Sequence, residues 1–80
     1  MVIKVKIIGT VNEVTVEVPP SSTLRDVLVQ VIQDNVLIGF QSPEDVANFY
    51  LIYIDSRVVG LETTIMEDEH VLMIPALEGG

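Results

Sequence analysis

The N-terminal part of the chain alternates apolar and polar residues. Over residues 1–8, three β-branched residues share one face and two lysines the other: Ile3, Val5 and Ile7, with Lys4 and Lys6. After a turn at Gly9-Thr10 the alternation returns, with apolar positions at Val14, Val16 and Val18. Period two in β-branched residues is typical of half-buried strands. We therefore predict a two-stranded hairpin, which Pro19-Pro20 ends because proline cannot donate to a strand ladder.

After Pro20 the spacing of apolar residues changes to that of a helix. One stripe follows the 3.6-residue period: Leu24, Val27, Leu28, Val31 and Ile32. Thr23 is a suitable N-cap, and Asp26 stands at the N3 position of a capping box. Asp34-Asn35 suits the end of the helix. The pattern predicts one main helix that begins at Leu24.

The second half of the chain predicts shorter elements. Gly39 interrupts residues 36–48, but Ser42-Pro43-Glu44-Asp45 has the cap, proline and acids of a short helix. Residues 49–54 form an apolar strand, and the turn Asp55-Ser56 leads to a strand at 57–59. The remaining segments are a loop at 60–64, an acidic turn at 67–69 and a strand at 70–74, ended by Pro75.

This order of elements predicts an α+β fold. A mixed sheet of four to five strands with the main helix packed across one face buries both apolar patterns. Because parallel strands are joined by right-handed crossovers, we place the last strand beside the first, in the middle of the sheet. That is the β-grasp arrangement. We expect one domain over residues 1–75 and a flexible C-terminal tail over residues 76–80.

Composition narrows the classes of function. The 80 residues contain no cysteine, which excludes disulfides, thiolate metal sites and a cysteine nucleophile. Twelve acidic residues against four Lys and Arg give a formal net charge of −8, which disfavours nucleic acid as a partner. Apolar runs are far shorter than the roughly 20 residues that span a bilayer. A soluble cytoplasmic protein without membrane attachment is expected.

The tail carries the candidate chemistry. Gly79 and Gly80 have no side chain to bury, so they add little to stability. They suit a chain end that threads a narrow active site of another protein, where the Gly80 carboxylate reacts. A free carboxylate needs ATP-dependent adenylation before a sulfur or amine nucleophile attacks it. The chain has no phosphate loop, so we expect a substrate or carrier and not an enzyme.

The strand at 49–54 suggests a surface for partners. Phe49, Tyr50, Leu51 and Tyr53 cannot all face inward, so one face of the sheet is open for docking. The predicted partner-binding residues are Leu51, Tyr53, Met73, Pro75, Ala76, Leu77 and Glu78. His70 directly follows the acidic turn that contains Glu67 and Glu69, but one histidine beside turn carboxylates is typical of a solvated strand start. No metal site and no cofactor are expected.

Two segments resemble a known family. Residues 16–24, VEVPPSSTL, resemble the strand-to-helix junction of ubiquitin-like proteins. Residues 53–80, YIDSRVVGLETTIMEDEHVLMIPALEGG, are similar to the C-terminal half of the β-grasp sulfur carriers. That branch includes the small subunit of molybdopterin synthase, the thiamine-pathway sulfur carrier and related archaeal and eukaryotic modifier proteins.

The resemblance implies a function for Gly80. In this family the terminal glycine is adenylated by a ubiquitin-activating-type enzyme and becomes a thiocarboxylate. The molybdopterin branch delivers the sulfur to the pterin of the molybdenum cofactor, with the tail inside the large subunit of the synthase. The thiamine branch delivers it to the thiazole, and the modifier branch joins the carboxyl group to lysines.

Three departures leave the branch open. The molybdopterin branch commonly has two prolines before the tail, where this chain has only Pro75. The acidic turn at 67–69 lacks the usual glycine, and Glu78 stands where a small residue is common. Lys4 and Lys6 are the only lysines and offer few points for self-linked chains, which favours a carrier over a modifier.

Overall fold

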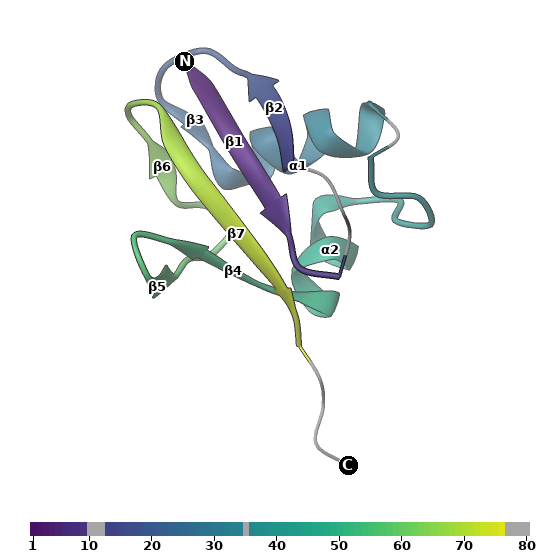
Figure 1. Ribbon diagram of the computed structural model, residues 1–80. Coiled ribbons are helices and arrows are strands. Elements are labelled where there is room, and N and C mark those ends of the chain that lie inside the picture. The colour runs from purple at the N-terminus through teal and green to yellow at the C-terminus, as the bar shows by residue number, and fades with distance from the viewer. Residues whose placement is uncertain (10–12, 35, 77–80) are drawn as a thin grey trace.

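The computed structural model describes residues 1–9, 13–34 and 36–76. Five strands form a mixed sheet in the order β2-β1-β7-β4-β5, and a separate two-stranded pair joins β3 and β6. α1 lies across one face of the larger sheet (Figure 1). In chain order the elements are β1 (Val2–Ile7), β2 (Glu13–Glu17), β3 (Ser22–Thr23), α1 (Leu24–Gln33), α2 (Pro43–Phe49), β4 (Tyr50–Ile54), β5 (Arg57–Val58), β6 (Thr64–Ile65) and β7 (Glu69–Pro75).

The first and last strands form the parallel pair of the sheet. β1 runs parallel to β7, with registers from Ile3↔Glu69 to Ile7↔Met73. β2 pairs antiparallel with β1, and β4 pairs antiparallel with β7. The position predicted for the last strand, beside the first, is therefore confirmed. The predicted α+β class, a mixed sheet with one main helix across it, is confirmed as well.

The core lies between the sheet and α1. Alternate residues of β1 are buried while the lysines between them are exposed. α1 adds the side chains of its apolar stripe. Four of the five are fully buried, namely Leu24, Val27, Leu28 and Val31, and Ile32 is partly buried against them. Burial of each such side chain is worth roughly 1.5–3 kcal/mol. The stripe explains why this segment folds as a helix against the sheet.

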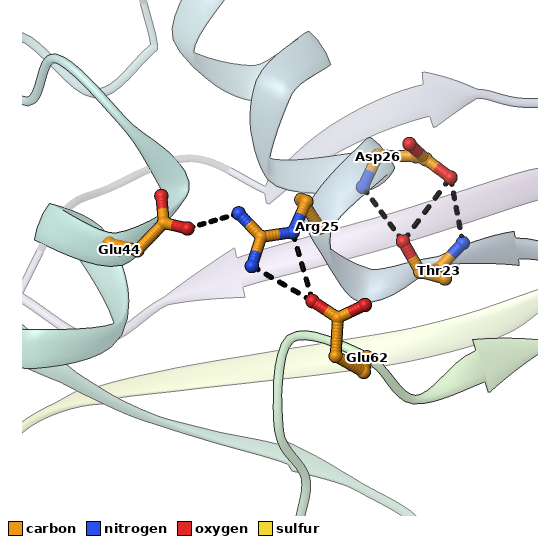
Figure 2. Close-up of polar contacts among 5 residues, drawn as sticks. All are labelled: Thr23, Arg25, Asp26, Glu44 and Glu62. Carbon is orange, nitrogen blue, oxygen red and sulfur yellow. Dashed lines mark hydrogen bonds and ion pairs between the residues drawn. The ribbon is translucent and has the colours of Figure 1, made fainter.

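Side-chain caps set the starts of both helices. In α1, the Thr23 backbone N–H donates to Asp26 Oδ2 at 2.9 Å, and the Asp26 N–H donates to Thr23 Oγ1 at 3.4 Å. This is the predicted capping box (Figure 2). In α2, the Asp45 N–H donates to Ser42 Oγ at 3.2 Å, and proline occupies the first turn. The short helix predicted after Ser42 is present.

Some predicted boundaries differ from the structure. The sequence predicts a strand that begins at Phe49, but Phe49 is the last residue of α2. The boundary was misplaced because the apolar run over residues 49–54 gives no sign of where the helix stops. β7 begins at Glu69 and includes Pro75, one residue longer at each end than predicted. β3 and β6 were not predicted, since two paired residues on each strand leave no periodic pattern.

Arg25 ties α1 to two other segments. Its Nη1 pairs with Glu44 Oε2 of α2, while Nε and Nη2 donate to Glu62 Oε1 at 3.0 and 2.8 Å (Figure 2). The Arg25 and Glu44 side chains are 37% and 55% exposed, so solvent screens this pair. The hydrogen bond to Arg25 lowers the pKa of Glu44 below its ordinary value of 4.5.

Replacing Glu44 with glutamine is expected to lower Tm slightly near neutral pH. Because the folded-state pKa is lowered, the stabilisation is present above pH 4.5 and is lost as pH falls through the lowered pKa. Melting curves of both proteins across this pH range measure the effect, with Glu67→Gln as an exposed control. A Tm difference that persisted well below the lowered pKa would contradict this assignment.

The turn between β4 and β5 carries two residues in the left-handed region. Asp55 has φ 52° and Ser56 has φ 65°, as the two central residues of a type I′ turn require. This conformation costs a residue with a Cβ about 1 kcal/mol or more. Ser56→Gly is therefore expected to raise the free energy of unfolding by about 1 kcal/mol in urea denaturation. The reciprocal control is Gly39→Ala, at φ 94°, which should lower it.

Candidate functional site

The described part of the chain ends at Ala76, directly after β7, and we call this point the exit of the chain. Tyr50 lies opposite Pro75 in the sheet, and the Ala76 N–H donates to the Phe49 carbonyl oxygen at 2.8 Å. Because β7 is parallel to β1, this exit is at the end of the sheet opposite to Met1 (Figure 1). Ala76 is the last described residue. The predicted site residues Leu77, Glu78, Gly79 and Gly80 lie outside the described residues.

The face of the sheet opposite to α1 carries an apolar patch beside this exit. In the antiparallel pair β4–β7, Leu51 lies opposite Ile74, and Tyr53 lies opposite Leu72. Leu51 is 42% exposed, and the other three are half-buried. We call these four residues the open-face patch. A shallow hollow on this face is lined by Tyr53, Asp55, Ser56, His70, Leu72 and Ile74.

Met73 does not belong to this surface. It was predicted to bind partners, but it is fully buried among the core residues. The reason is strand alternation: in β7, Val71 and Met73 point toward α1, while Leu72 and Ile74 point the other way. The sequence did not resolve this because both faces of β7 are apolar. Leu72 and Ile74 take the place that was assigned to Met73.

Basic groups border the patch on the β1 side. Lys4 lies opposite His70, and Lys6 lies opposite Leu72. The side chains of Lys4, Lys6 and His70 are exposed. Because the whole chain has a net charge of −8, the positive charge of Lys4 and Lys6 is confined to this edge of the patch. Across the pair β1–β2, Lys6 lies opposite Glu13. The open face therefore offers an apolar centre with charged neighbours.

The described residues do not gather a metal site. Among residues 1–9, 13–34 and 36–76, no group of three or more His, Asp or Glu side chains lies close enough to hold a metal ion. In the same part of the chain, no helix is long and apolar enough to cross a membrane. What the geometry brings together is a chain end and an apolar surface next to it.

Comparison with known proteins finds solved structures with a similar fold. No protein-family model and no curated protein matches the chain. Among solved structures, Caldiarchaeum subterraneum ubiquitin is similar, with a TM-score of 0.66 and 21% identity over 100% of this chain and 98% of that one. A ubiquitin-like protein from the same hyperthermophilic archaeon has a TM-score of 0.54 and 18% identity, over 99% of this chain and 100% of its own. The predicted ubiquitin-like fold is thereby confirmed: the chain is a small protein with a ubiquitin-like fold.

Proposed function

We propose that this protein is a sulfur carrier whose Gly80 carboxyl group becomes a thiocarboxylate. The observation that carries the proposal is the exit of the chain from β7, next to the open-face patch. The resemblance of residues 53–80 to β-grasp sulfur carriers adds the glycine ending. The recipient that fits best is the pterin of the molybdenum cofactor, with the large subunit of molybdopterin synthase or an equivalent acceptor enzyme as partner.

The chemistry needs an activating partner. A carboxylate oxygen of Gly80 attacks the α-phosphorus of ATP, and pyrophosphate leaves. Sulfide (HS⁻) then attacks the acyl carbon and forms the carbon–sulfur bond of the thiocarboxylate, while AMP leaves with the carboxyl oxygen. A ubiquitin-activating-type adenylating enzyme supplies both steps, and the chain contributes its end. Gly79 and Gly80 lack side chains, which suits passage through a narrow channel.

A ubiquitin-like modifier is the second candidate. The solved structures with the same fold are named as ubiquitin or ubiquitin-like proteins, which favours this reading. Here an amine replaces the sulfur nucleophile and Gly80 is joined to a lysine of another protein. Delivery of sulfur to the thiazole of thiamine is the remaining alternative. All three use the same activated carboxyl group.

Intact-mass analysis of the protein from its own host tests these candidates. A mass gain that matches exchange of one oxygen for sulfur, located on Gly80 by tandem sequencing, is the expected result. Gly80 in isopeptide linkage to other proteins would replace the carrier with the modifier. An unmodified carboxylate under every growth condition would contradict all three candidates, and leave a protein that acts by non-covalent contacts.

A further inference from the structure

Three aromatic side chains meet beside the exit of the chain. The ring centroids of Phe40 and Phe49 are 5.6 Å apart, and those of Phe49 and Tyr50 are 5.0 Å apart, both edge-to-face. Phe40 and Tyr50 are 5.9 Å apart, so each ring contacts the other two. Phe49 is nevertheless 53% exposed. An aromatic ring held by two neighbours and open to solvent is a rigid apolar contact that the described residues leave uncovered.

The same residues hold the last part of the described chain. The Phe49 carbonyl oxygen accepts the Ala76 N–H at 2.8 Å, and Tyr50 lies opposite Pro75. The backbone that anchors the end of β7 therefore also carries two of the three rings. We call Phe40, Phe49 and Tyr50, with Pro75 and Ala76, the tail-root cluster.

The length of the remaining chain limits where a partner can stand. Four residues follow Ala76, and a fully extended chain spans at most about 14 Å over four residues. An enzyme that takes the Gly80 carboxyl into its active site must approach within this reach of Ala76. The enzyme surface around the active-site entrance then lies within this distance of Ala76, and the aromatic rings of the tail-root cluster are among the residues next to Ala76.

We propose that the tail-root cluster is a second contact surface for the enzyme that adenylates Gly80. This inference rests on the proposed activation of Gly80. Phe49 inserts into an apolar socket beside the entrance of the active site. The socket has a basic rim, because exposed Asp45 of α2 and a net charge of −8 favour positive partners. Preorganised aromatic side chains that become desolvated commonly dominate the affinity of an interface.

The cluster shares no residue with the open-face patch, although both include residues of β4 and β7. Side chains alternate along β4, so Leu51 lies on the open face, while the Tyr50 ring packs on the core side against Phe40 and Phe49. A partner that holds both surfaces fixes the domain about the exit of the chain and aims the tail at the nucleotide. Residues 36–49 then set which adenylating enzyme accepts this chain, since they carry Phe40 and Phe49 and the acids beside them.

Steady-state ATP–pyrophosphate exchange with the adenylating enzyme of the same host tests this inference. Phe49→Ser is expected to lower kcat/KM for the carrier by about tenfold or more, mainly through KM, because hot-spot contacts have effects of this size or larger. The matched control is Met66→Ser. Met66 is 67% exposed and precedes the opposite end of β7 from Ala76. The seven residues of β7 span roughly 20 Å, more than the tail reaches.

A binding readout separates contact from stability. A photo-crosslinking amino acid at position 49 should crosslink to the enzyme, and one at position 66 should not. Melting temperatures of both serine variants exclude loss of fold as the cause. The second contact surface alone would be overturned if the wild-type chain supported exchange, Phe49→Ser had the same kcat/KM as wild type, and position 49 gave no crosslink. No exchange with wild type would overturn the proposed activation of Gly80 as well.

Discussion

A chain that ends at Glu78 is expected to fold as the full chain does and to lose all activity as a substrate for adenylation. Without Gly79 and Gly80 the carboxyl group sits on a residue with a charged side chain, two residues short of the active site. The full chain reaches at most about 14 Å beyond Ala76, and the shortened chain about half of that. ATP–pyrophosphate exchange measures the loss, and we expect none above background.

Stability should not change in this deletion. The buried hydrophobic residues of the described core run from Ile3 to Met73, so removal of two later glycines takes away no core side chain. Equal melting temperatures for the full and shortened chains are therefore expected. A shortened chain that still supported exchange, or sulfur transfer in the host, would contradict the assignment of Gly80 as the reactive end.

Substitution by aspartate at Met73 and at Leu72, two neighbouring positions of β7, is expected to have opposite effects on folding. Met73→Asp places an unpaired carboxylate in the core, where Met73 is fully buried. Loss of such a side chain alone costs about 2–5 kcal/mol. A domain of 80 residues has a total stability of about 4–12 kcal/mol. We expect Met73→Asp to be largely unfolded at 25 °C, as measured by circular dichroism and urea denaturation.

Leu72→Asp is the matched variant. Leu72 points to the open face, so its aspartate remains in contact with water and the domain should stay folded. Adenylation should nevertheless fall, because the variant places a charge in the centre of the open-face patch. Exchange kinetics and melting curves on the same sample separate the two effects. Equal unfolding of both variants would contradict the orientation of β7, and normal exchange with Leu72→Asp would remove the open-face patch from docking.

The parts of the fold that were predictable are those with local signals. The capping box at Thr23 and Asp26 and the apolar stripe after it determine α1 within a few residues. The alternation in β1 and β2 determines which side chains are buried. In each case the residues of the element itself are enough to predict the helix start or the buried side chains, so no long-range contact had to be known.

Long-range contacts account for what was missed. β3 and β6 pair through Ser22↔Ile65 and Thr23↔Thr64, and nothing in either dipeptide indicates a distant partner. The orientation of β7 depends on its pairing with β1 and β4, because Leu72 and Met73 are equally apolar. The contact of Phe40 with Phe49 arises only when the loop after α1 folds back on α2. The last two of these contacts determine which residues make up the open-face patch and the tail-root cluster.

The parallel pairing of β1 with β7 also bears on synthesis of the protein. β1 can pair with β7 only after residues 69–73 have left the ribosome, more than 60 residues after β1 itself. Such distant pairing slows folding relative to domains with local contacts. A chain truncated before β7 would leave β1 and β4 without the strand between them. Completion of this sheet during synthesis is therefore set by translation of β7 and not by that of β1 or β4.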